Sequence, residues 1–354
     1  MRIILTTFCL ILFLFSTVAN AKIVFGSRRD SGSGVYVMND DGSNATLLTN
    51  KLIRNGPHHP RWSPDGTQII FRMQVNPPEN REYHLFGMSA GGTNARPLTE
   101  RHTGIDDQPS ISPDGKRVLF TRSTFKKHCT NILDLESGAL IQLSDIVANS
   151  SDWSPDGRQI VFASPSFAHA GGPAADIWMM DADGENLRKL LPPPAVEGRV
   201  IDRRTPRWSP DGKQILYTET EYTFENRGNI LNLKFRFLKA NRYLICDQNG
   251  EHILQLSISK KWKSRDIDWM GNGESVLLSA AELKLNKLVS NDYHHYNIYK
   301  YNIATKKITR LTDHPGTDYE VDWISGYTLP VSSKGKMSTQ WGQIKKGTPN
   351  LSND

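Results

Sequence analysis

The 354-residue sequence has few cysteines, and its only long apolar run lies at the very start. Of its three cysteines, Cys9 falls inside that run, whereas Cys129 and Cys246 lie far apart in the chain. An exported protein could join the last two in a disulfide, but spacing cannot set their distance. Two alternatives remain, a disulfide or two separate thiols, and we expect separate thiols.

Motifs of catalysis and metal binding are also absent. The chain has no Gly-x-Ser-x-Gly nucleophile elbow and no phosphate-cradling glycine loop. None of the following histidines shows zinc-ligand spacing: His58, His59, His128, His169, His294, His295 and His314. Asp181 to Gly184 resembles the start of a calcium loop, but Leu190 stands where that loop needs glutamate. We expect no catalytic residue and no metal ligand.

The charge balance is only mildly basic, at +6 for the whole chain. The basic residues form small separate clusters, such as Lys126-Lys127 and Arg203-Arg204, without an organised aromatic pattern. Such clusters are typical of solvated loops rather than of a nucleic-acid surface. We therefore expect no nucleic-acid partner.

The N-terminus has the features of a secretory signal. Arg2 precedes an apolar run from Ile3 to Phe15, and Ala19 and Ala21 supply the small residues of a cleavage site before Lys22. The run is shorter than the roughly 20 residues that a spanning helix needs. These features predict a signal peptide over 1–21, a periplasmic or secreted protein, and no membrane insertion.

The most informative feature that is present is the tetrapeptide Ser-Pro-Asp-Gly, whose serines lie at positions 63, 112, 154 and 209. Proline presets φ for a type I turn, aspartate suits the next position, and glycine accepts the positive φ that follows. Each copy therefore predicts a tight hairpin. The strand after each turn is apolar almost throughout, as in Gln68 to Phe71, which is typical of a sheet packed between two others.

A second hairpin follows in each unit, for example Val35 to Met38, a turn at Asn39 to Gly42, and Thr46 to Thr49. Each unit thus predicts four antiparallel strands. The motif serines are 49, 42 and 55 residues apart, against about 40–45 residues for a four-stranded propeller blade. Degenerate copies at Trp269 and Trp323 bring the number of equivalent positions to six.

The two chain ends complement each other. Lys22 to Ser27 matches a second strand whose first strand is missing, and Val321 to Trp323 is a first strand without its later partners. Pairing them would close a ring and remove exposed sheet edges. We predict an all-β, six-bladed propeller over 22–330, closed in this way, with a polar tail over 331–354; the alternative is an open sandwich or two smaller barrels.

Long irregular segments at the end of the ring opposite the tight turns point to a binding face there. These include 74–84, 164–176, 192–206 and 219–228. Ionisable residues also recur just before the tryptophan position and two residues further back, which strict alternation would place on one side of the innermost strands. The candidate partner-binding residues are His59, Arg61, Asp152, Arg204, Arg207, Asp266, Asp268, Glu320 and Asp322. They predict either a mixed-charge channel mouth or salt bridges between blades.

The repeat Trp-Ser-Pro-Asp-Gly-x-x-Ile-x-Phe, followed by Ile-Tyr-x-Met and an Asp-Gly turn, resembles the TolB-type (WD40-like) propeller repeat over about residues 22–325. The resemblance covers the propeller only, because Lys22 starts a blade directly, whereas TolB proper has an α/β domain first. In that family TolB is periplasmic, and its propeller binds the lipoprotein Pal and colicin peptides at the channel mouth. Similar repeats also occur in propeller domains of prolyl-oligopeptidase-like peptidases and in oligogalacturonate lyases.

The resemblance therefore implies an exported, non-catalytic scaffold that binds a protein or peptide at the loop-rich face. The alternative is a lyase or hydrolase acting on an anionic polysaccharide, which His58, His59, His294 and His295 leave open. We expect a monomer with no cofactor, and a structural calcium ion in the channel remains the open alternative.

Overall fold

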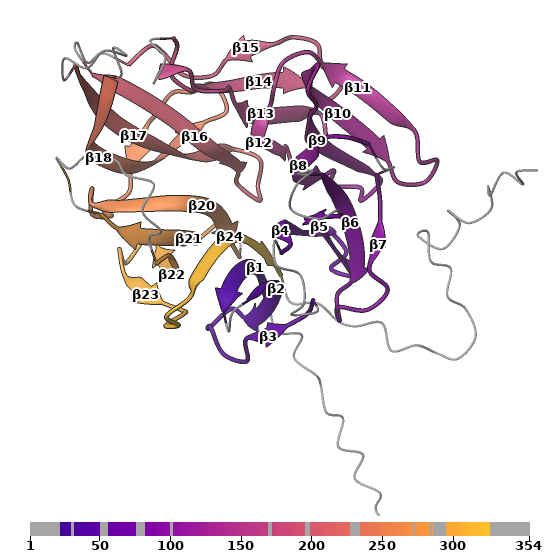
Figure 1. The fold of residues 1–354 in the computed structure, drawn as a ribbon. Coiled ribbons are helices and arrows are strands. Elements are labelled where there is room, and N and C mark those ends of the chain that lie inside the picture. The colour runs from indigo at the N-terminus through magenta and orange to yellow at the C-terminus, as the bar shows by residue number, and fades with distance from the viewer. Residues whose placement is uncertain are drawn as a thin grey trace, which may run out of the picture.

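The computed structural model describes residues 22–29, 32–49, 56–75, 82–99, 102–168, 172–194, 199–226, 234–271, 273–283, 285 and 295–325. In these ranges the chain folds into antiparallel β-sheets arranged around a common centre (Figure 1). No helix in the described ranges has the length and apolarity to cross a membrane. The predicted signal peptide (1–21) and tail (331–354) lie outside the described residues.

Four of the sheets have four strands each. The first contains β24 (Thr317–Ile324), β1 (Lys22–Arg29), β2 (Gly32–Asn39) and β3 (Thr46–Leu47). The second contains β12 (Asn149–Trp153), β13 (Gln159–Ala163), β14 (Ile177–Asp181) and β15 (Arg188–Lys189). The third contains β16 (Val200–Trp208), β17 (Gln214–Asn226), β18 (Lys234–Asp247) and β19 (Leu254–Gln255). The fourth contains β20 (Trp262–Met270), β21 (Ser275–Glu282), β22 (Asn297–Asn302) and β23 (Ile308–Arg310).

The fifth sheet has eight strands instead of the predicted four. It combines β4 (His58–Trp62), β5 (Gln68–Gln74), β6 (Tyr83–Ser89) and β7 (Arg96–Pro97) with β8 (Ile105–Ile111), β9 (Arg117–Ser123), β10 (His128–Asp134) and β11 (Leu140–Ser144). One parallel bridge, between Tyr83 and Ile105, joins the two halves. The arrangement is thus all-β and propeller-like, with a local fusion that the repeats did not predict.

The Ser-Pro-Asp-Gly turns form the predicted hairpins. In the first copy, the amide of Ser63 donates to the carbonyl of Gln68 (2.9 Å), and the amide of Gly66 donates to the carbonyl of Ser63 (2.8 Å). The Ser63 hydroxyl also donates to Asp65 (2.6 Å) and accepts from the Gln68 amide (2.9 Å). Gly66 has a φ of 67°, a conformation in which other residues are strained. The other three copies repeat this set of hydrogen bonds.

The strands after these turns are buried on both faces, as predicted. Ile69, Ile70 and Phe71 on β5 are at most 1% exposed. Because alternate side chains point to opposite faces, such a strand packs against a neighbouring sheet on each side. Apolar clusters accordingly join successive sheets, as where Val161 and Met179 pack with Trp208 and Ile215.

The first and last described strands lie side by side (Figure 1). β1 pairs antiparallel with β24, from Lys22 opposite Ile324 to Arg28 opposite Thr317. Phe25 on β1 and Val321 on β24 share one apolar cluster with Met270 and Leu277. The two chain ends therefore build one sheet, and apolar packing joins it to the sheet of β20 and β21.

The sheet of β16 to β18 differs from the predicted loops. Residues 200–206 and 219–226, expected to be irregular, extend β16 and β17 instead, and β17 pairs with β18 from Gln214–Asp247 to Asn226–Lys234. Tyr222, Leu238 and Leu283 form a small apolar cluster of their own there. The extension is ordered because it buries apolar side chains, and it makes β17 and β18, with 13 and 14 residues, the longest of the described strands (Figure 1).

Candidate functional site

The nine candidate residues lie on the innermost strands β4, β12, β16, β20 and β24. Each of these strands starts at the loop-rich end and runs toward its turn. The positions nearest the tryptophans, such as Arg61, therefore lie closer to the tight turns, and His59 and Glu320 lie closer to the loop-rich end.

A bulge interrupts the alternation on which the prediction relied. His59, Gln108, Ser150, Thr205 and Glu320 have positive φ values of 48° to 57°. The register shifts between His58 and Arg61, and at or next to the corresponding place in five other inner strands. The prediction that side chains alternate strictly between the two sides of the inner strands is therefore wrong at this position. Left-handed backbone is unfavourable at a β-branched residue such as Thr205, so its recurrence marks a structural requirement of the inner strands.

Asp266 binds two arginines from different sheets. Its carboxylate accepts from Arg61 (2.9 Å) at one oxygen and from Arg207 (2.8 Å) at the other. Arg61 also donates to the carbonyl of Val321 (2.8 Å), and Arg207 donates to that of Ser150 (2.9 Å). Burial works against the charged form of Arg61, but Asp266 and Asp322 outweigh it and raise its pKa. These three residues form the salt bridges between sheets that were one of the two predicted alternatives.

Three aspartates just before the tryptophan positions cap neighbouring backbone. Asp152 accepts from the amide of Trp208 (2.8 Å), Asp268 from that of Trp323 (3.1 Å) and Asp322 from that of Trp62 (2.6 Å). In each case the tryptophan belongs to another inner strand. Burial raises the pKa of all three carboxyls, and the charge of Asp322 adds to the rise at Asp268.

Glu320 on β24 contacts His58 and His59 on β4. It accepts from the backbone amide of His59 (2.5 Å) and lies 3.4 Å from the His59 ring and 3.4 Å from Arg265. Burial disfavours its charge, but His59, His58 and Arg265 outweigh burial and hold its pKa well below the usual range. Burial lowers the pKa of His59, so this imidazole is neutral at neutral pH.

The innermost cavity is small. His59, Arg61, Arg207 and Asp266 line it, together with Gln108, Pro109, Ser150, Ser151 and Arg265. Its free volume is about 20 Å³, which holds about one water and no sugar ring or peptide residue. Arg204 is outside this lining; it pairs with Asp202 (3.1 Å), and its side chain is 44% exposed.

Arg265 and Gln108 also belong to the site, although neither was among the predicted site residues. Arg265 directly precedes Asp266, and its side chain is 44% exposed. Gln108 accepts a very short hydrogen bond from the amide of Ser150 on the neighbouring inner strand. Their positions in the repeat were the only available signal, because neither residue type alone indicates a site.

A larger hollow of about 910 Å³ lies on the tight-turn side, between the strands β9 to β11 and the strands β13 and β14. Its size would admit a small ligand. However, its charged side chains include the turn residues Asp156 and Arg158, which are 59% and 85% exposed. Solvent screens such groups, and we assign no chemistry to them.

The structure also shows the state of the two cysteines and the conformation of the segment from Asp181 to Gly184. Cys129 and Cys246 are buried free thiols, as expected, and burial raises the pKa of Cys246 to about 12. Asp181 to Gly184 forms a hairpin turn, in which the Gly184 amide donates to the carbonyl of Asp181 (2.9 Å).

Among the described residues, two clusters have ligand atoms close enough for a metal ion. His84, His102 and Asp106 form one of them, and their separations of 18 and 4 positions do not match the zinc-ligand spacings expected from sequence.

No known family model matches the chain. It is 26% identical over 206 residues to the uncharacterized protein Atu1656 of Agrobacterium fabrum, covering 55% of this chain and 63% of that protein. It is 31% identical over 118 residues to the uncharacterized peptidase YuxL of Bacillus subtilis, covering 31% of this chain and 16% of that protein. The chain thus spans less than two thirds of either relative.

Solved structures share the architecture at low identity. TolB from Acinetobacter baumannii has a TM-score of 0.63 and 17% identity, covering 86% of this chain and 66% of that one. Hydrazine synthase of Kuenenia stuttgartiensis has a TM-score of 0.65 and 14% identity, covering 87% and 47%. Oligogalacturonate lyase of Vibrio parahaemolyticus has a TM-score of 0.52 and 14% identity, covering 83% and 75%. Likeness at this identity shows the fold alone, and the chain therefore has a TolB-type β-propeller fold.

Proposed function

We propose that this protein is an exported, non-catalytic scaffold that binds a protein or peptide at its loop-rich face and channel mouth. The observation that carries the proposal is that two acidic side chains at the mouth are buried, whereas two basic side chains there are exposed. The mouth carboxylates of Asp266 and Glu320 are at most 4% exposed and occupied by contacts within the ring, whereas Arg204 and Arg265 are each 44% exposed. Among these four residues the accessible charge is thus positive.

This arrangement favours a ligand that carries carboxylates, either acidic side chains or a chain terminus. Guanidinium groups bind carboxylates through two parallel hydrogen bonds. Asp202 and Glu320 hold Arg204 and Arg265 in place without burying them. The long β16–β18 sheet supplies a rigid wall beside Arg204, as a binding surface on a firm scaffold requires.

The proposal includes a ring of six blades closed by β24 and β1. Six apolar clusters support it, because each joins one four-strand set to the next, including the seam between β1–β3 and β4–β6. The single bridge between β6 and β8 supports counting the eight-stranded sheet as two blades. Gly42 lies in the turn between β2 and β3 and closely approaches the backbone of Leu311, which follows β23. This approach supports contact between the sheet of β1–β3 and the sheet of β20–β23.

We further propose cleavage before Lys22 and a periplasmic location, in keeping with the TolB-type repeat. Strand β1 begins at Lys22, so cleavage there would leave the fold whole. In this proposal the protein is a monomer that binds neither nucleic acid nor membrane.

Affinity capture from an envelope extract, followed by mass spectrometry, tests the binding function. Charge reversal of Arg204 and Arg265 together should reduce the recovery of any captured partner by at least tenfold. Reversal of Arg158, which is 85% exposed on the tight-turn side, is the matched control. Equal capture by the mouth variant and the control would contradict the proposal.

His59 supports a second candidate, a lyase that acts on an anionic polysaccharide. Its imidazole is neutral at neutral pH and 20% exposed, and Arg265, which contacts the same Glu320, is 44% exposed. His59 could therefore accept a proton while Arg265 binds a substrate carboxylate outside the small cavity. Incubation with a panel of anionic polysaccharides and divalent metals should then release unsaturated products, and His59→Ala should abolish them. Absence of turnover across the panel would exclude this candidate and leave the scaffold.

A further inference from the structure

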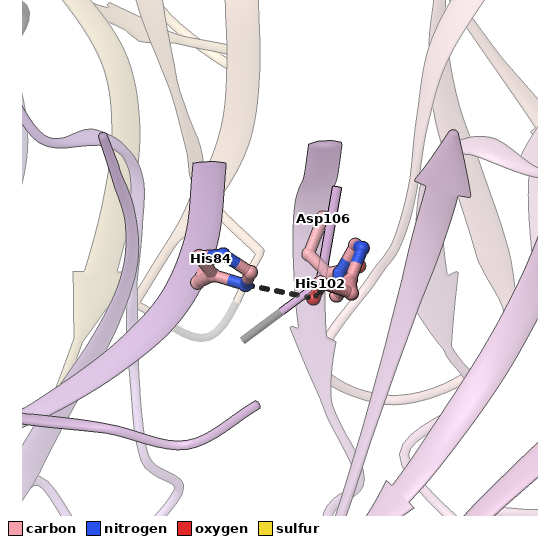
Figure 2. Close-up of side chains that lie close together, drawn as sticks. All are labelled: His84, His102 and Asp106. Carbon is pink, nitrogen blue, oxygen red and sulfur yellow. Dashed lines mark ion pairs between the residues drawn. The ribbon is translucent and has the colours of Figure 1, made fainter. Parts of the chain in front are cut away.

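A cluster of two histidines and one aspartate lies where the two halves of the eight-stranded sheet meet. His84 follows Tyr83 on β6, and Asp106 follows Ile105 on β8. Because Tyr83 and Ile105 form the parallel bridge between these strands, His84 and Asp106 are adjacent across the seam. His102 lies just before β8 and completes the cluster (Figure 2).

Two members of the cluster are fully buried, and its imidazoles make no hydrogen bonds within the described part of the chain. His84 is 1% exposed and Asp106 is 0% exposed. Neither ring nitrogen of His84 or of His102 makes a hydrogen bond. Buried polar atoms are nearly always satisfied, and each exception calls for an explanation such as an ion. The two rings, each with one nitrogen within 4 Å of the Asp106 carboxylate, therefore point to a ligand that binds them.

The distances suit a metal ion. One Asp106 oxygen lies 3.0 Å from Nε2 of His102 and 3.9 Å from Nδ1 of His84 (Figure 2 marks the second pair). A tetrahedral ion about 2.1 Å from each ligand would hold neighbouring ligand atoms about 3.4 Å apart. The rings meet edge-on, at 85° with centroids 4.8 Å apart. Small side-chain movements would thus bring all three ligands onto one ion.

Neighbouring charged residues orient the Asp106 carboxylate and affect the net charge around the cluster. Arg122 donates to both oxygens of Asp106, at 2.7 and 2.9 Å, and such a partner orients a metal ligand. The Arg122 charge opposes a cation, but buried Glu82 lies near enough to His84 to influence it electrostatically.

We propose that His84, His102 and Asp106 bind one first-row divalent metal ion, most naturally Zn²⁺, which joins β6 to β8 across the seam. Two imidazoles and one carboxylate are a common ligand set for such ions. His102 is 21% exposed, so a water can reach the ion and fill the fourth position. The ion is structural, because it ties together two four-strand sets that share one backbone bridge among the residues that the structure describes.

The test uses the full mature protein without a polyhistidine tag, stripped with a chelator and then titrated with Zn²⁺. Elemental analysis after dialysis should find about one zinc per chain, and zinc should raise the melting temperature by several degrees because it binds only the folded state. Co²⁺ in place of Zn²⁺ should give the visible absorption of a tetrahedral histidine-bound ion.

Variants assign the site. His84→Gln and His102→Gln should each lose the zinc, the cobalt absorption and the zinc-dependent rise in melting temperature. His252→Ala removes the exposed histidine of the other candidate cluster and should leave all three unchanged. The partly exposed His102 keeps the test valid if the His84 variant fails to fold. Zinc content that is unchanged in a folded His102→Gln protein, or no zinc uptake by the parent protein, would overturn the proposal.

Discussion

The tight-turn face and the channel mouth are built in opposite ways. At the turns, each hydrogen bond joins residues two to five positions apart, and the four copies match. At the mouth, the contacts join residues 205 and 59 positions apart at Asp266 and 260 apart at Asp322, and the residue before the tryptophan is arginine on β4 and β16 but aspartate on β12, β20 and β24. Exact repetition therefore marks the turns, which are local and structural, and variation between the repeats marks the part that could recognise a partner.

The largest predicted effect tests the long-range network. Asp266→Ala would leave the guanidinium groups of Arg61 and Arg207 buried without their shared carboxylate. Breaking a buried ion pair in this way costs about 3–5 kcal/mol. Urea unfolding should show this loss in the free energy of unfolding.

Asp313→Ala is the matched control, because that carboxylate is 81% exposed in its pair with Arg310. Its removal should change stability by less than about 1 kcal/mol. If both variants were equally stable, the inner network would not hold the ring together.

A smaller effect is expected at the turns. Gly157 has a φ of 69°, and an added Cβ would meet only Cδ of Pro113 at 3.7 Å. Gly157→Ala should therefore reduce stability by about 1–2 kcal/mol through backbone strain alone. Gly91→Ala, in an open position without positive φ, should instead stabilise by about 0.4–1 kcal/mol. Thermal melting of both variants measures the difference in sign, and two equal shifts would contradict the strain argument.

The two regions should respond oppositely to pH. The hydrogen bond from Ser154 is the main cause that lowers the pKa of Asp156, so its stabilisation is present above the unfolded value of about 3.9 and is lost as pH falls through the folded pKa. Burial raises the pKa of Asp268, so the folded state takes up a proton first, and stability rises as pH falls toward about 4.

Denaturant unfolding between pH 2 and 7 separates these contributions. Asp268→Asn should make the free energy of unfolding less dependent on pH above pH 4. Asp156→Asn should reduce the loss of unfolding free energy that occurs below pH 4. Identical changes in the two variants would show that the turn and mouth carboxyls do not differ as described.

The smallest effect on stability is expected at the exposed arginines. Replacing Arg204 and Arg265 with glutamine should reduce the free energy of unfolding by less than about 1 kcal/mol each, since half-exposed ion pairs contribute little. Equilibrium unfolding checks this value. A loss as large as that of Asp266→Ala would assign these arginines to the ring rather than to a binding surface.

Much of the fold could be predicted from residues that act over short distances. Ser63 and Gly66 specify a turn with their own hydrogen bonds, and the apolar run at Ile69 to Phe71 indicates a strand buried on both faces. The candidate site was predicted less well. Its members lie on the inner strands as expected, but the bulge at His59 and Thr205 was invisible because left-handed backbone at such residues has no sequence signal. The length of β17 was also missed, since its polar sequence is ordered by Tyr222 and Leu238 packing far from the turn.

Turn chemistry and strand identity follow from the sequence alone, because they depend on φ preferences and on residue patterns within a few positions. The pairing of β1 with β24 follows from the incomplete repeats that contain them. The tertiary structure decides which charges meet. Only folding places Arg61 and Arg207 on one carboxylate, and His84 beside His102 and Asp106. The physical reason is that burial and neighbouring charge set the protonation and accessibility of these groups, and both depend on residues that are distant in the chain.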